Sequence, residues 1–218
     1  MRGAITALNN FPVSLPGHII LTDDPQRAKM LAAHHLENAE LVHEHGDELA
    51  YTGEYRGVPI AVISSGGGNS DFSSFPQQIM GTFPGEYASN GSSLRELVYI
   101  GACVSTTVRH SLRSVILAAG GSESLLSRAV AAARQFVIPA TARTVLSPSA
   151  ELPEEGCIID EATGAFYERA RAGGVEALSI LTVSEDVIKG EKMEEHEFRS
   201  RFYAAARLAF ETLAIDNR

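Results

Sequence analysis

Residues 49–63 read LAYTGEYRGVPIAVI, and they combine two strand-like runs with a tight turn. We predict that Leu49–Tyr55 and Val58–Ser64 are strands and that Arg56-Gly57 turns the chain between them, giving a hairpin. The second run, VPIAVIS, is almost wholly apolar, which is typical of a strand buried in a sheet. Residues 65–70, SGGGNS, follow it directly, so the backbone at Gly66 can either approach a ligand closely or make a simple tight turn.

Outward from this hairpin, short apolar runs alternate with stretches of helical period, and this alternation predicts an α/β domain. Residues 81–93 contain many turn formers and no period, so we predict a surface loop there. Further strands are predicted at His18–Leu21, Glu40–His43, Leu97–Gly101, Ser114–Ala118, Phe136–Ile138, Gly156–Ile159 and Ala177–Ser184. Helices are predicted from Pro25 through His34, behind Ser122, from about Ala162 to Ala172 and near Glu194 to Ile215.

Composition limits the possible classes of protein. The chain has 218 residues, so we predict one domain over 1–218, and 44% hydrophobic with 21% charged residues disfavours disorder. No apolar run approaches the roughly 18 residues of a membrane span, and we expect a cytoplasmic protein without membrane contact. The net charge of −9 without a basic stripe disfavours nucleic-acid binding. Two separate cysteines, Cys103 and Cys157, make a disulfide framework improbable.

Several strings, taken in order, resemble the nucleoside phosphorylase family, which includes bacterial purine nucleoside phosphorylase and uridine phosphorylase. The strings are DPQR at 24–27, AELVHEHGDELAYTGEYRGVPIAVI at 39–63, VYIGACV at 98–104, and EATGAFYERARAGGVEALSILTVSED at 161–186. The resemblance spans residues 18–213. It implies a three-layer α/β/α sandwich with a mixed central sheet, a homo-oligomer (a dimer or a trimer of dimers), and no metal or organic cofactor.

The resemblance also implies a reaction, in which phosphate attacks C1′ of a nucleoside while a carboxylate near the base assists its departure. The family's Gly-Asp-Pro-x-Arg loop corresponds to Asp23–Arg27, so Arg27 and Asp24 are candidate substrate-binding residues and Asp23 places a negative charge beside the anion. Other expected phosphate ligands are changed. The arginine before the Ile-Gly pair is Tyr99, the Ser or Thr after Gly101 is Ala102, and the arginine lent by a neighbouring subunit falls at Gly46.

The ribose and base positions are partly retained. The family's Met-Glu pair falls at Glu161-Ala162, and the side chain of Ala162 cannot accept a hydrogen bond from the ribose. Asp160 or Glu161 can take the place of that glutamate if the backbone shifts by one residue. The alternative for these carboxylates is a solvated helix N-terminus. Glu185 falls where the family assists the leaving base, with Asp186 beside it; the alternative is that both cap the next segment.

Two other signals have a simpler explanation. Cys103 follows the glycine of a buried strand end, and we expect it to pack against the base or the core rather than to act as a nucleophile. His43 and His45 fall on one face of a predicted strand, but no third ligand is evident, so we predict solvent exposure and no metal.

Three functions remain open at this point. The first is a phosphorylase that cleaves the N-glycosidic bond of a purine or pyrimidine nucleoside in nucleoside catabolism and salvage, with phosphate as co-substrate. The second is a phosphate-independent nucleosidase, in which Asp23 or Asp24 activates water. The third is a non-catalytic member that binds a ligand or partners an active relative, because each lost donor typically costs two to three orders of magnitude in rate.

Overall fold

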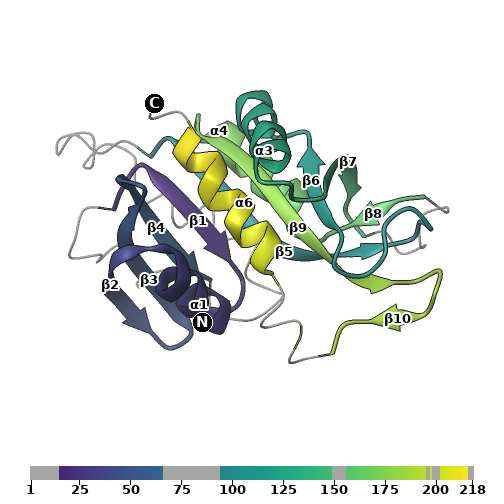
Figure 1. The fold of residues 1–218 in the computed structure, drawn as a ribbon, viewed down its shortest axis with the longest axis horizontal. Coiled ribbons are helices and arrows are strands. Elements are labelled where there is room, and N and C mark those ends of the chain that lie inside the picture. The colour runs from purple at the N-terminus through teal and green to yellow at the C-terminus, as the bar shows by residue number, and fades with distance from the viewer. Residues whose placement is uncertain (1–14, 66–93, 149–155, 195–196, 198–201, 216–218) are drawn as a thin grey trace, which may run out of the picture.

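The computed structural model describes residues 15–65, 94–148, 156–194, 197 and 202–215, and Figure 1 shows their arrangement. Helices and strands alternate, as predicted for an α/β protein. In chain order the elements are β1 (His18–Thr22), α1 (Pro25–His35), β2 (Glu37–His45), β3 (Glu48–Tyr55), β4 (Val58–Ser64), β5 (Glu96–Ser105), β6 (Val115–Ala119), α3 (Glu123–Gln135), β7 (Ala140–Leu146), β8 (Ile158–Ile159), α4 (Thr163–Ala172), β9 (Glu176–Asp186), β10 (Glu191–Lys192) and α6 (Tyr203–Ala214).

The hairpin predicted from residues 49–63 is confirmed. Strands β3 and β4 pair antiparallel, from Ala50 opposite Ile63 to Tyr55 opposite Val58. Both turn residues have positive φ angles, 52° at Arg56 and 78° at Gly57, and this combination matches the right-handed twist of a two-residue hairpin. Strand β2 extends the hairpin antiparallel to β3 and ends the sheet on that side.

In the part of the chain that the structure describes, all ten strands belong to one mixed sheet. Its centre is parallel: β1 pairs with β4 on one side and with β5 on the other, and β5 pairs parallel with β9. Beyond β9 the strands no longer form a simple row, because β9 pairs with β6, β6 with β7, β7 with β8, and β8 with β5 again. These five strands therefore close into a ring. The three-layer arrangement stays a prediction, while the mixed sheet is confirmed.

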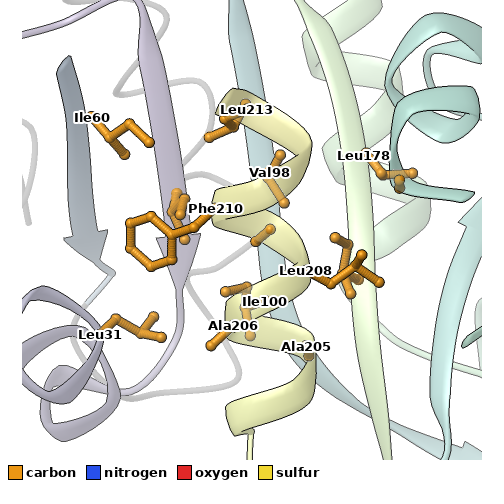
Figure 2. Packing of buried hydrophobic residues seen from close by; sticks show 14 of the residues in the cluster. Leu31, Ile60, Val98, Ile100, Leu178, Ala205, Ala206, Leu208, Phe210 and Leu213 are labelled. Atoms are coloured by element: carbon orange, nitrogen blue, oxygen red, sulfur yellow. The ribbon is translucent and has the colours of Figure 1, made fainter. Parts of the chain in front are cut away.

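Helices lie on both faces of the sheet. Buried residues of α1, α3 and α6 share one hydrophobic cluster with β1, β4, β5 and β9, whereas Phe166, Tyr167 and Ala170 of α4 belong to a second cluster. Figure 2 shows Phe210 of α6 between Leu31 and Ile60, while Leu208 points toward the strand that carries Leu178. Phe210 has no exposed surface, and burying such a ring stabilises the fold by about 1.5–3 kcal/mol.

One predicted strand is wrong. Phe136 ends α3 by donating its backbone N–H to the Ala132 carbonyl at 2.9 Å, and the Ile138 N–H donates to Ala133 at 2.8 Å. Val137 between them has a φ of 54° and is 85% exposed. The apolar run at 136–138 is thus a helix terminus, and β7 begins only at Ala140, after Pro139.

Other predicted elements agree with the structure within a few residues. The helices at Pro25, behind Ser122 and near Ala162 are α1, α3 and α4, and the described part of the last helix begins at Tyr203. Strand β9 extends to Asp186, two residues past its predicted end. The predicted loop at 81–93 lies outside the described residues. Within the described ranges, no helix combines the length and apolar character that a membrane crossing requires.

Candidate functional site

The carboxyl ends of the parallel strands meet at one edge of the sheet. Thr22, the last residue of β1, lies opposite Ser64 of β4 and opposite Ile100 of β5, and β5 and β9 continue beyond this level. Open α/β sheets bind ligands at such an edge. The predicted site residues that follow β1, and those on β5 and β9, lie at this edge of the sheet or beyond it. Gly66, two residues after β4, lies outside the described residues.

Asp24 begins helix α1. Its Oδ1 accepts the backbone N–H groups of Gln26 at 2.7 Å and Arg27 at 3.2 Å, and Pro25 occupies the first helical position. Both features satisfy or remove N–H groups that a helix start leaves without partners. The structure therefore places the Asp24 carboxylate at the helix start, where it positions Arg27.

Arg27 is buried, with 1% of its surface exposed. Its Nη1 donates to Thr22 Oγ1 at 2.9 Å and to the Ile100 carbonyl at 3.5 Å, and it pairs with Asp23 Oδ1 at 2.5 Å. Its guanidinium carbon lies 3.9 Å from the ring centre of Phe202. The guanidinium that is predicted to bind an anion thus has its charge balanced by a neighbouring carboxylate, and an aromatic ring packs against it.

Tyr99, Gly101 and Cys103 alternate along β5, so their side-chain positions share one face of the strand. Tyr99 is 3% exposed, and a Cβ at Gly101 would clash with the Tyr99 hydroxyl and ring. Gly101 therefore leaves the space that the Tyr99 ring occupies. Cys103 is also 3% exposed and packs in the same hydrophobic cluster as Tyr99.

Asp160 and Glu161 follow β8 and have different environments. Asp160 is 8% exposed, and its Oδ2 accepts the Thr163 backbone N–H at 2.7 Å at the start of α4. Glu161 is exposed, and Ala162 immediately precedes α4. Of these two candidate ribose ligands, the fold thus buries Asp160 and leaves Glu161 in solvent.

We call Asp23, Arg27, Tyr99, Cys103 and Asp160 the Tyr99 cluster, because the charges of the two aspartates and the arginine act on the Tyr99 hydroxyl and that of Asp160 also acts on the Cys103 thiol. Burial raises the pKa of Tyr99 well above its ordinary value, and the charges of Asp23 and Asp160 raise it further against the opposing effect of Arg27. Burial and the charge of Asp160 likewise raise the pKa of Cys103. Both side chains are therefore neutral at pH 7, a phenol and a thiol rather than anions.

The pKa of the Asp160 carboxyl group is also raised. Burial raises its pKa, hydrogen bonds from Thr163 and Ala162 act against that, and the charge of Asp23 raises it again. A carboxyl with a raised pKa is a better proton donor near neutral pH than an ordinary aspartate. The Tyr99 cluster thus combines two acidic side chains, one arginine and a neutral phenol.

Glu185 and Asp186 lie at the end of β9, next to an irregularity. Cys103 pairs with Val183, but Val104 pairs with Glu185, so Ser184 is the extra residue of a bulge, and its hydroxyl donates to the Cys103 carbonyl at 3.2 Å. Bulges of this kind change the direction of the side chains that follow. Glu185 falls opposite Val104 rather than opposite Cys103.

The two carboxylates have different partners. Glu185 is 39% exposed and lies 3.3 Å from Nζ of Lys192 on β10. Asp186 has no exposed surface, accepts the Lys189 backbone N–H at 3.2 Å and lies 3.1 Å from Lys189 Nζ. Burial acts to raise the pKa of Asp186, but the backbone and ammonium of Lys189 outweigh it and hold the pKa below its ordinary value. Asp186 is therefore a fixed anion, whereas Glu185 is accessible to a ligand.

The structure thus brings five of the predicted or flagged side chains together and leaves Glu185, Asp186 and Glu161 outside that group. Sequence reasoning did not identify Phe202 as a site neighbour; its ring belongs to the hydrophobic core and also packs against the Arg27 guanidinium. No local pattern distinguishes a core phenylalanine from one that contacts a guanidinium in another element. The described residues contain no group of three possible metal ligands, and His43 and His45 lie on edge strand β2.

Comparisons with known proteins agree with this fold. The family model described as "Phosphorylase superfamily" matches residues 18–216. The DeoD-type purine nucleoside phosphorylase of Hahella chejuensis is 28% identical over 225 residues, covering 88% of this chain and 91% of the relative. The DeoD-type enzymes of Bacillus subtilis and Shewanella oneidensis are 26% and 28% identical, covering 90% and 94% of this chain and 93% and 97% of the relatives. With nearly its whole length matched by the family model, the chain belongs to the phosphorylase superfamily.

Proposed function

We propose that the protein cleaves the N-glycosidic bond of a purine or pyrimidine nucleoside, with phosphate as the attacking group. The observation that carries this proposal is the Tyr99 cluster at the carboxyl edge of the parallel strands, where the charges of buried Arg27 and buried Asp160 both act on Tyr99. Membership of the phosphorylase superfamily and the similarity to purine nucleoside phosphorylases support it.

The proposed reaction separates charge at C1′ of the ribose. A phosphate oxygen forms the new bond to C1′ as the bond to the base nitrogen breaks, and the bonding electrons leave with the base. Positive charge develops on the sugar, which carboxylates at Asp23 and Asp160 would stabilise. Positioned side chains and the co-substrate supply all these charges, so the reaction needs no metal or organic cofactor.

The leaving base needs a hydrogen-bond donor or a proton. Glu185 is the accessible carboxylate at the end of β9, and its partner Lys192 lies 3.3 Å away. A proton shared between this pair and the base nitrogen would assist departure by general acid catalysis. Asp186, held by Lys189, would keep the end of β9 in place.

Hydrolysis is a second candidate, and the Asp23–Arg27 pair favours it. A guanidinium that is already balanced by a carboxylate at 2.5 Å attracts phosphate less strongly than an isolated one. Asp23, 34% exposed on its side chain, would then orient or deprotonate a water molecule that attacks C1′. The remaining alternative is a protein that binds a nucleoside without cleaving it.

One assay separates these functions. Purified protein is incubated with adenosine, guanosine, inosine and uridine, each with and without phosphate, and both released base and sugar product are measured. Base release that requires phosphate and yields ribose 1-phosphate supports the proposal. Release without phosphate, giving free ribose, supports hydrolysis instead. No release from any nucleoside contradicts both enzymatic functions.

A further inference from the structure

A hollow lined by two arginines lies beyond the end of β5, apart from the Tyr99 cluster. Its volume is about 350 Å³, and the residues that matter for its chemistry are Thr107, Arg109, His110 and Arg143, with Val108 and Ile188 at its opening. We call it the arginine pocket. Val108 is 74% exposed and Ile188 is 42% exposed, so the rim combines apolar surface with the polar floor.

Arg143 reaches the pocket from β7 and is held by two hydrogen bonds. Its Nε donates to His110 Nε2 at 3.0 Å, and its Nη1 donates to the Ala142 carbonyl at 3.1 Å. A guanidinium carries five N–H donors in a planar fork, so these contacts use two of them and leave others for a ligand. The fork geometry matches two oxygens of a phosphate or carboxylate.

His110 acts as the support of Arg143 in this arrangement. It is 6% exposed, and burial lowers its pKa, with the charges of Arg143 and Arg109 lowering it further. A neutral imidazole accepts at Nε2, which fixes the direction of the Arg143 side chain. The hydroxyl of Thr107 accepts the Arg109 backbone N–H at 3.3 Å and so orders the segment that carries the second arginine.

Charge balance makes the pocket unusual in this protein. The chain carries a net charge of −9, yet across the described ranges no carboxylate forms an ion pair with Arg109 or Arg143. Arg27, Arg56, Arg113 and Arg128, by contrast, each pair with a described carboxylate. Two arginines that face one hollow without an acidic partner repel each other unless an anion lies between them.

The arginine pocket lies apart from the contacts of Arg27. Arg27 contacts the carbonyl of Ile100 on β5, whereas the pocket begins at Thr106, six residues further along the chain and one residue past the end of β5. At about 3.3 Å per residue this separation is roughly 20 Å. A phosphate held by Arg109 and Arg143 is therefore bound separately from the contact that Arg27 makes at Ile100.

We propose that the arginine pocket is a separate binding site for a phosphoryl group, carried either as inorganic phosphate or on a nucleotide. Arg109 and Arg143 bind the phosphate oxygens, His110 holds Arg143 in place, and Val108 and Ile188 offer apolar contact to whatever the phosphate is attached to. The volume of about 350 Å³ accommodates a phosphate with a small organic group.

Calorimetric titration of the full-length protein with inorganic phosphate, AMP and adenosine tests this site. In an Arg109→Gln/Arg143→Gln double variant, we expect the affinity of the arginine pocket for phosphate or AMP to fall at least about tenfold. Binding of phosphate at the proposed active site should be unchanged. Arg134→Gln, which removes an exposed arginine on α3, is the matched control and should bind as the parent does. Tighter binding of AMP than of phosphate identifies a nucleotide, and equal binding identifies free phosphate.

Unchanged phosphate and AMP binding by the double variant would overturn the proposal. If the double variant does not fold, crystals of the unaltered protein soaked in tungstate give a second test, since the heavy oxyanion should lie against Arg143, and its absence there would also refute the site. The base-release assay tests the proposed function independently of the titration. The double variant should still cleave nucleosides in that assay.

Discussion

Asp23 balances the charge of Arg27, the residue that we propose binds the anion. In the resembling family a glycine occupies this position, and here the carboxylate lies 2.5 Å from the guanidinium. Without it, Arg27 keeps its position, because Thr22 and Ile100 still accept its hydrogen bonds and Asp24 still begins the helix. Asp23 therefore sets the electrostatics of the anion position without building its geometry.

We predict that Asp23→Gly lowers the KM for phosphate by about tenfold if the protein is a phosphorylase, because a competing anion is removed from Arg27. Asp23→Asn, which keeps a hydrogen-bond acceptor but no charge, should give an intermediate KM. Steady-state base release at varied phosphate measures both. A nucleosidase would instead lose turnover in Asp23→Gly and show no phosphate dependence.

Glu185 is the residue on which proton transfer to the base depends in the proposed reaction. Glu185→Gln keeps the shape and hydrogen-bonding capacity of the side chain but removes its proton exchange, so we expect kcat to fall at least about tenfold. Glu191→Gln on β10 is the control, since Glu191 is exposed and pairs by its backbone with Asp186. Turnover in Glu185→Gln equal to that of the control would remove Glu185 from the mechanism.

At the scale of elements, helices α1 and α6 meet through an aromatic contact at His35. Its ring stacks on Phe210 with centroids 4.6 Å apart and lies near Tyr55 and Tyr203. Burial, followed by the charges of His34 and Arg207, lowers the pKa of His35 from 6.5 to about 4. Protonation would place a cation in a packed aromatic contact.

This shift predicts how stability depends on pH. Between pH 6.5 and about pH 4 the unfolded chain binds a proton at His35 that the folded protein does not, so the free energy of unfolding falls as pH decreases through that range. His35→Phe should reduce the loss of stability between pH 7 and pH 5, measured by urea denaturation. Exposed His45, whose charge does not contribute to the His35 shift, gives the control His45→Gln, which should lose stability as the parent does.

The turn of the β3–β4 hairpin is tied to α6 by a buried carboxylate. Glu211 is 1% exposed, lies 2.8 Å from Arg56 Nη1 and accepts the Tyr55 hydroxyl at 2.8 Å. Arg56→Ala leaves this charge buried with only the phenol, so we predict a loss of about 2–3 kcal/mol in the free energy of unfolding.

Glu211→Gln removes the charge while keeping the hydrogen bond, and it should cost about 1 kcal/mol. The double variant Arg56→Ala/Glu211→Gln should therefore be less destabilised than the sum of the two single variants, as chemical denaturation would show. Strict additivity would mean that the ion pair does not couple the hairpin to α6.

At the scale of the whole molecule, the resemblance to the phosphorylase family predicts a dimer or a trimer of dimers. Gly46, in the turn between β2 and β3, has no side chain to lend to a neighbouring site, so the proposed assembly would not complete the anion position from that residue. Light scattering after size exclusion should give twice or six times the subunit mass of 23.3 kDa. A mass that stays at one subunit across protein concentrations would contradict the prediction.

Much of the fold was predictable because its signals are local. Asp24-Pro25 begins α1 through a side-chain cap and a fixed proline φ angle, and Arg56-Gly57 forms a hairpin turn between two strand-like runs. Phe136–Ile138 shows where this reasoning fails: an apolar run of strand length has no period that separates a strand from a helix terminus, and only the two capping hydrogen bonds distinguish them.

The sequence by itself determined the α/β class, the hairpin of β3 and β4, and the start of α1 at Asp24-Pro25. Only the tertiary structure decided that Asp23 pairs with Arg27 under Phe202, that Asp160 lies buried within reach of their charges, and that β5 to β9 close into a ring. The physical reason is range: caps, turns and hydrophobic periods act within a few residues. Burial and charge balance, in contrast, depend on which distant segments the folded chain brings into contact.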